Sequence, residues 1–225
     1  MSRPLLVTDC DEVLLHMVVP FGQWLDEAHH ISLDLSLGRF GEAMREKDGG
    51  ALIEGERVWA LLEEFFTTEM HRQYPFPGTI AALDAIRAVA DIVVLTNIGI
   101  HLQEGRAIQL RSAGVDAPVV GNRGPKGLPL ARIIAEYQPS ACVFVDDIGL
   151  HLDSAAEHAP MAWRLQMVGE QMLAPRVPTA ASAHARIDDW ATAAPWILAR
   201  FAEGRADAAP AGLDHEAEAM LKPAS

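Results

Sequence analysis

Short apolar runs that end abruptly in polar residues recur along this chain, and stretches with helical periodicity separate them. The runs cover residues 3–9, 91–95, 117–120 and 141–145. Apolar runs of this length are typical of buried parallel strands. Helical stripes precede two of them and consist of Ile80, Leu83, Ile86 and of Leu130, Ile133, Ile134, Tyr137. The alternation predicts a Rossmann-like α/β fold with a doubly wound parallel sheet.

Residues 16–77 interrupt this alternation directly after the first predicted strand. They contain two amphipathic stripes, separated by a Gly-rich polar stretch from Gly38 to Gly55. The segment Tyr74–Gly78 closes the insert, because its two prolines and glycine do not continue a helix. The stripes consist of Phe21, Trp24, Leu25, Ala28 and of Val58, Leu61, Leu62, Phe65. We therefore predict a small all-helical cap domain over residues 16–77.

The remaining chain divides into a core and a tail. Residues 1–15 and 78–202 contain the alternating strands and helices and are predicted to form one α/β core. Residues 203–225 are rich in Ala, Glu and Asp with little apolar surface to bury, so we expect an acidic, disordered tail. A chain of 225 residues, half of them hydrophobic, suits one main core of this size.

Composition also indicates which partners the protein can bind and in which cellular compartment it is expected. The net charge of −13 argues against a nucleic-acid-binding protein, which needs clustered Lys and Arg. We find neither a run of about 18 apolar residues nor a signal peptide, and we expect a cytoplasmic protein without a membrane partner. Cys10 and Cys142 are predicted at opposite ends of neighbouring strands. A disulfide between them is not expected, and a reducing compartment fits.

Asp9 and Asp11 follow the first predicted strand. Side chains two residues apart on an extended chain point the same way, so both carboxylates can face one ligand. Asp also commonly forms turns and caps after strands, and the pair alone fits that role better. Because crossovers are right-handed, the polar strand ends collect at one edge of the sheet, where open α/β sheets bind ligands. We expect the functional site at this edge.

The other predicted strands end in residues that complement a phosphate group. Thr96 and Asn97 follow the second strand and can hold a phosphoryl oxygen, or can form a plain helix N-cap. Lys126 lies in a Gly-rich loop after the third strand, as a phosphate counter-charge or a solvated lysine. Asp146 and Asp147 end the fourth strand and can bind a hard cation or cap the next helix. Four such coincidences favour the functional interpretation.

Taken together, these segments resemble a known family. The runs VTDCDEVLL, VVLTNIG, GPKGLPLARI and VFVDDIGLHLDSAA resemble the four ordered motifs of the haloacid dehalogenase superfamily. The resemblance covers about residues 3–165, and the insert lies where that family places a small helical cap. It implies a Mg²⁺-dependent phosphatase that acts on a small phosphorylated metabolite through an aspartyl-phosphate intermediate.

The resemblance also implies a role for each residue at the strand ends. Asp9 is the implied nucleophile, and Asp11 the general acid and base. Thr96 and backbone N–H groups would bind phosphoryl oxygens, while Lys126 would neutralise charge on Asp9 and the phosphate. The implied Mg²⁺ ligands are a carboxylate oxygen of Asp9, the carbonyl of Asp11, and one or both of two aspartates. Of these two, Asp147 is expected to bind directly, with Asp146 as a second ligand or an outer partner.

Two positions depart from the family pattern. Glu12 stands where members usually carry Gly or another small residue, so the turn after the nucleophile is expected to differ. His151 stands where many members place Asp or Asn near the metal. Phosphomutase and dehalogenase chemistry remain alternatives on this scaffold, as does a non-catalytic binding protein. Carbon–halogen hydrolysis would leave Asp11 without an acid role, which favours phosphate.

Overall fold

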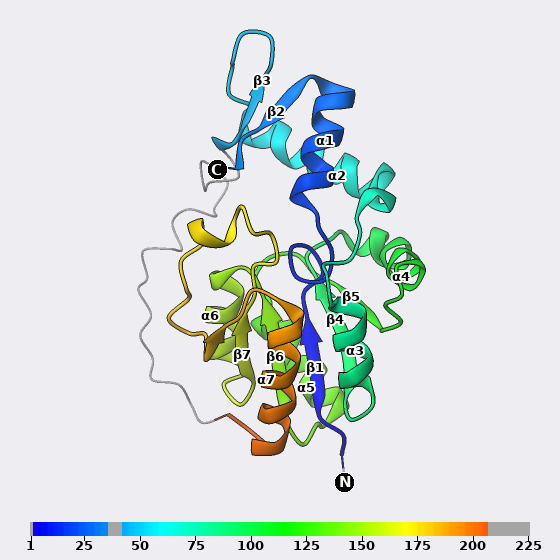
Figure 1. The fold of residues 1–225 in the computed structure, drawn as a ribbon, viewed down its shortest axis with the longest axis vertical. Coiled ribbons are helices and arrows are strands. Elements are labelled where there is room, and N and C mark those ends of the chain that lie inside the picture. Colours follow the sequence, from blue (N-terminus) through cyan, green and yellow to red (C-terminus); the bar gives the residue numbers. More distant parts are fainter. Residues whose placement is uncertain (1, 36–41, 207–225) are drawn as a thin grey trace.

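The computed structural model describes residues 2–35 and 42–206 (Figure 1). A six-stranded sheet forms its core, in the order β5-β4-β1-β6-β7-β8, and every neighbouring pair is parallel. The strands are β1 (Leu5–Thr8), β4 (Asp91–Thr96), β5 (Val119–Gly121), β6 (Cys142–Asp146), β7 (Trp163–Gln166) and β8 (Ala185–Arg186). The four predicted strands are β1, β4, β5 and β6, and the predicted doubly wound sheet is confirmed.

Helices cover both faces of this sheet. They are α3 (Thr79–Arg87), α4 (Gln103–Ser112), α5 (Gly127–Tyr137), α6 (Gly149–His158) and α7 (Trp190–Glu203), with short 3₁₀ turns at Met70–Arg72, Ile100–Leu102 and Ala174–Arg176. Along β1, Leu6 packs with apolar residues of α3, α4 and α7. Leu5 and Val7 pack with those of α5 and α6 on the opposite face. This alternation of side chains gives the fold two cores, one on each side of the sheet.

The insert after β1 lies above the carboxyl ends of the strands (Figure 1). It contains α1 (Val18–His29), β2 (Ile31–Leu33), β3 (Met44–Glu46) and α2 (Gly55–Thr68). The prediction that it is entirely helical is wrong, because β2 and β3 pair as an antiparallel hairpin. Strands of three residues are too short to show a readable alternation. The hairpin buries Ile31 and Met44 in a separate small core with α1 and α2.

Strands β7 and β8 were not predicted either. The sequence of β7, WRLQ, lacks an apolar run, yet Arg164 and Gln166 are buried. Their side chains bond to backbone groups: Arg164 Nε donates to the Ser182 carbonyl at 2.7 Å, and Gln166 Nε2 to the Pro178 carbonyl at 3.1 Å. Buried polar groups satisfied in this way are tolerated in a sheet, but they conceal a strand from hydrophobicity patterns.

The predicted tail falls mostly on residues 207–225, which lie outside the described residues. Within the described ranges, no helix combines the length and the apolar character needed to cross a membrane. Cys10 and Cys142 are both buried, free thiols.

Candidate active site

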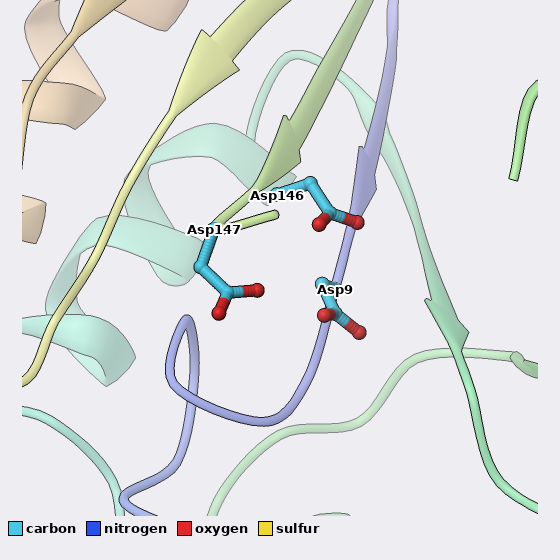
Figure 2. A group of neighbouring side chains, drawn as sticks. All are labelled: Asp9, Asp146 and Asp147. Carbon is cyan, nitrogen blue, oxygen red and sulfur yellow. The ribbon is translucent and has the colours of Figure 1, made fainter. Parts of the chain in front are cut away.

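Three carboxylates converge at the edge of the sheet below the insert. Asp9 follows β1, Asp146 is the last residue of β6, and Asp147 follows it. One oxygen from each lies within 4.8 Å of the others, and the three side chains lie side by side at the ends of the two strands (Figure 2). The parallel pairing of β1 with β6 produces this convergence. A hydrogen bond of 2.8 Å from Asp9 N to the Val145 carbonyl continues the pairing beyond the end of β1.

Lys126 joins the cluster from the start of α5. Its Nζ lies 2.7 Å from Asp9 Oδ1 and 2.8 Å from Asp146 Oδ2, and its side chain is fully buried. The position of Lys126 depends on a close approach of α5 to α6. A Cβ on Gly127 would lie 2.0 Å from the Ser154 carbonyl oxygen, so only glycine fits there. The lysine is therefore part of the site rather than a solvated loop residue.

The electrostatics of the cluster favour a cation. Burial, the opposing charge of Lys126, and the like charges of Asp146 and Asp11 together raise the pKa of Asp9 to about 7, and burial is the largest cause. Burial likewise raises the pKa of Asp147 well above its ordinary value. Burial alone would lower the pKa of Lys126, but Asp146 and Asp9 raise it above its ordinary value. A single ammonium group therefore faces three crowded carboxylates.

The oxygen atoms in this cluster fit a hard divalent cation. Asp146 already uses both of its oxygens, Oδ2 with Lys126 and Oδ1 as acceptor of the Ile148 N–H at 3.0 Å. Asp147 Oδ1 is buried and has no hydrogen-bond partner among the described residues. Such an orphaned carboxylate oxygen requires a partner, and carboxylate oxygens suit Mg²⁺. Asp147 is thus the better placed of the two aspartates to bind a metal ion directly.

Asp11 does not join the three clustered carboxylates. Its Oδ1 accepts hydrogen bonds from Gln73 Nε2 at 2.6 Å and from Arg106 Nη2 at 3.0 Å. Its Oδ2 lies 3.1 Å from the same Arg106 nitrogen and 3.4 Å from Thr96 Oγ1. The candidate acid is therefore held by donors from α4, β4 and the segment after α2.

Two polar residues lie at the carboxyl end of β4: a buried threonine, and an asparagine whose amide connects neighbouring loops. Thr96 is fully buried beside Asp11. Asn97 is exposed, and its amide connects loops: Nδ2 donates to the Gly124 carbonyl at 3.0 Å, and Oδ1 accepts from Asn122 at 2.9 Å. His151 Nε2 lies 3.2 Å from Asn97 Nδ2. Burial lowers the pKa of His151, so it is a neutral neighbour of the site.

Glu12 has a left-handed backbone conformation, with φ of 60°, which favours glycine over other residues. Its Oε1 accepts hydrogen bonds from the N–H groups of Met17 and Val18, both at 2.8 Å, and so caps the start of α1. Burial raises the pKa of this carboxyl to about 7. In the turn after Asp9, Glu12 is therefore a strained residue whose side chain connects this turn to the insert.

Arg106 and Gln73 are the site residues that sequence reasoning missed. Arg106 lies in the polar stretch QEGRAIQL, which reads as an exposed helix, and Gln73 precedes the turn that closes the insert. Both are buried. No spacing in the sequence marks them, because their partner Asp11 is distant in the chain and only the tertiary fold brings the three together.

Comparison with protein-family models and with curated proteins finds no match. Solved structures do match. A HAD family hydrolase from Deinococcus radiodurans, with bound phosphate and sodium, has 16% identity and a TM-score of 0.60, covering 89% of this chain and 96% of that chain. The HAD-hydrolase YfnB from Bacillus subtilis, bound to magnesium, has 12% identity and a TM-score of 0.61, covering 88% and 99%.

An L-2-haloacid dehalogenase also matches, with 13% identity and a TM-score of 0.58, covering 88% of this chain and all of that chain (100%). At these identities the matches concern the fold. The order of the parallel strands, the insert after β1 and these structural similarities together show that the chain has the fold of the haloacid dehalogenase superfamily.

Proposed function

We propose that this protein is a Mg²⁺-dependent phosphatase that hydrolyses a small phosphorylated metabolite through an aspartyl-phosphate on Asp9. The observation that carries the proposal is the cluster of Asp9, Asp146 and Asp147 around Lys126. Three crowded carboxylates beside one buried lysine ionise fully only when more positive charge is present, which suits a divalent cation and a phosphoryl group together. The bound phosphate and magnesium in two similar structures support the same choice.

The side chains then have distinct tasks in the reaction. A carboxylate oxygen of Asp9 forms a bond to phosphorus while the bond from phosphorus to the leaving oxygen breaks, and Asp11 donates a proton to that oxygen. Asp11 then takes a proton from water, which attacks the phosphorus and releases Asp9 and inorganic phosphate. Lys126 holds Asp9 in place and stabilises the phosphoryl charge.

The residues that would hold Mg²⁺ are Asp9, Asp147 and the carbonyl of Asp11, with Asp146 as a second ligand or an outer partner. When bound, the ion offsets the repulsion between the carboxylate of Asp9 and a dianionic phosphate, which amounts to several kcal/mol at about 4 Å and intermediate dielectric.

One observation favours a second candidate, carbon–halogen hydrolysis. Both oxygens of Asp11 accept hydrogen bonds in this structure, so Asp11 can donate a proton only after one of these bonds breaks. A departing halide needs no proton, and one of the similar structures is an L-2-haloacid dehalogenase. Attack on a neutral carbon, however, gives the three clustered carboxylates no reason to bind a cation, which leaves phosphate hydrolysis as the stronger proposal.

The first test uses the full-length protein and measures the release of phosphate and of halide. We expect phosphate release from a panel of phosphate monoesters in the presence of Mg²⁺, loss of that release in EDTA, and no halide release from 2-haloacids. Asp9→Asn should abolish turnover, because its amide is a poor nucleophile, while circular dichroism shows an intact fold. Appreciable phosphatase activity in purified Asp9→Asn would contradict the mechanism, and halide release by the wild type would establish the second candidate.

A further inference from the structure

A fully buried arginine in α4 lies between the candidate acid and the insert. The Nη1 of Arg106 donates to Gln73 Oε1 at 2.9 Å and Gln109 Oε1 at 3.0 Å, while its Nη2 contacts both oxygens of Asp11. Its guanidinium also lies over the ring of Phe66, 5.3 Å from the ring centroid. One cation thus contacts the nucleophile loop, α2 and the segment that follows α2.

These contacts fix the direction of the Asp11 carboxylate. Arg106 bridges its two oxygens from one side, and Gln73 adds a second donor to Oδ1. The side chain of Arg106 has no exposed surface, and that of Asp11 keeps 16%. Hydrogen bonds from an ionised, desolvated donor are about twice as strong as neutral ones. Rotation of Asp11 therefore requires these bonds to break or to move together.

The same contacts connect Asp11 to the insert. Phe66 belongs to α2, and Gln73 follows the 3₁₀ turn Met70–Arg72 that ends the insert. Gln109, one turn after Arg106 on α4, also donates to the Met70 carbonyl. A displacement of α2 would move Phe66 and Gln73 away from the guanidinium, and the bonds that orient Asp11 would change with it.

We propose that Arg106 is a positioning residue, which orients the carboxylate of Asp11 for proton transfer and, through Gln73 and Phe66, makes that orientation depend on where the insert lies. This inference rests on the proposed phosphatase function. Packing alone is a poor reason for the residue, since a buried ion pair often contributes no more stability than apolar side chains of similar volume. Removing one partner of a buried ion pair lowers stability, so circular dichroism must first show that Arg106→Met is folded. In the folded variant the carboxylate of Asp11 should no longer be held in one direction.

The test is a double-mutant cycle with Arg106→Met, Asp11→Asn and the double variant, measured on phenyl phosphates whose leaving phenols span a range of acidity. General acids typically contribute about 10²- to 10⁴-fold, and most for poor leaving groups. We expect Arg106→Met to lower kcat at least about tenfold for the least acidic phenol and much less for the most acidic one. In the Asp11→Asn background it should have almost no further effect, because both changes remove the same contribution.

Three further variants separate a positioning role of Arg106 from general destabilisation. Arg106→Lys keeps a donor near Asp11 and should recover part of the lost rate on poor leaving groups. Arg164→Met is the matched control: Arg164 is an equally buried arginine in β7, bonded to the carbonyls of Ser182 and Ala162, and its loss should leave the leaving-group dependence unchanged. If Arg106→Met does not fold, Gln73→Leu removes a donor to Asp11 at the same junction and enters the same cycle.

The outcomes distinguish the two proposals. If the wild type hydrolyses none of the phenyl phosphates, the phosphatase function fails and the inference falls with it. Acid catalysis by Asp11 requires that Asp11→Asn slow the wild-type reaction most for the least acidic phenols. If that holds, two results overturn the positioning role alone. In one, the effect of Arg106→Met or Gln73→Leu adds to that of Asp11→Asn, and in the other it is equal for all phenols.

Discussion

The two aspartates at the end of β6 differ in what they already bind. Asp146 is occupied by Lys126 and the Ile148 N–H, whereas Asp147 keeps a buried oxygen without a partner. Asp147→Asn should therefore weaken Mg²⁺ binding more strongly than Asp146→Asn, for which we expect about tenfold, the lower end for an outer-shell partner. Isothermal titration of each EDTA-stripped variant with Mg²⁺ measures both affinities.

Asp146→Asn should show its main defect elsewhere, because Lys126 loses one of its two charged partners. We expect a larger loss of kcat than of Mg²⁺ affinity in that variant. A metal-binding defect confined to Asp146→Asn would reverse the assignment of the two residues.

At the scale of an element, α1 depends on a residue that lies outside it. Met17, its N-cap residue, makes no side-chain capping bond, and Glu12 supplies the acceptor instead. Glu12→Ala should lower the free energy of unfolding by about 1 kcal/mol, as loss of a helix cap does. Glu12→Gln keeps an amide oxygen as acceptor and should lose less.

Glu12→Gly provides an informative control for this prediction. It removes the cap but also relieves a left-handed backbone that costs a non-glycine residue about 1 kcal/mol, so its stability should lie near that of the wild type. Urea denaturation of the four proteins at pH 7 compares them. A Glu12→Ala protein as stable as the wild type would show that the two hydrogen bonds contribute nothing.

Helix α2 carries an exposed tryptophan on the side that faces the core loops. Trp59 is 66% exposed and lies four residues before Glu63, whose carboxylate is 3.0 Å from His101 and 3.3 Å from Arg123. Trp59→Ala should change the preference among phosphorylated substrates while leaving kcat for phenyl phosphate almost unchanged. Thr68, nine residues on, lies on the opposite side of the helix and supplies the control Thr68→Ala. An unchanged preference in Trp59→Ala would exclude this helix face from substrate selection.

At the scale of the whole molecule, the site reduces the stability of the metal-free protein as pH rises. The pKa of Asp9 is raised to about 7 from an ordinary 3.8, so the folded state retains a proton that the unfolded chain has already lost. The favourable contribution of this proton is complete below the ordinary pKa and is lost as pH rises through 7. Between pH 6 and pH 8 the loss amounts to about 1 kcal/mol.

Asp9→Asn tests this effect, because Glu12, whose pKa is raised, and His16 and His151, whose pKa values are lowered, are present in both proteins. The variant also removes the charge of Asp9, which is one cause of the raised pKa of Asp147, so the comparison measures the effect of the pair. In EDTA we expect the variant to gain stability relative to the wild type at pH 8, and much less at pH 6. Urea midpoints at the two pH values measure the difference. An equal difference at both would mean that Asp9 titrates outside this range.

The sequence predicted the residues of the candidate site better than the elements around them. Short apolar runs and a glycine-rich turn can be recognised from the local sequence, and the site residues lie at their ends. Parallel pairing of the strands brings these residues together: Asp9, Lys126, Asp146 and Asp147. The hairpin in the insert and strand β7 escaped prediction because three-residue strands and buried polar side chains leave no periodic signal. Arg106 escaped for a related reason, since its burial depends on partners far away in the chain.

The hydrogen bond between α7 and the loop after Asp9 has a consequence for the order of events during synthesis. The indole N–H of Trp190 donates to the carbonyl of Val13 at 2.8 Å, across 177 positions of the chain. The ribosome therefore completes Asp9 long before the residue that secures its loop. At typical translation rates the interval is roughly 10 to 40 s. Throughout that time the growing polypeptide already carries the proposed nucleophile but lacks its brace, so the proposed hydrolytic activity should arrive only after α7 has left the exit tunnel.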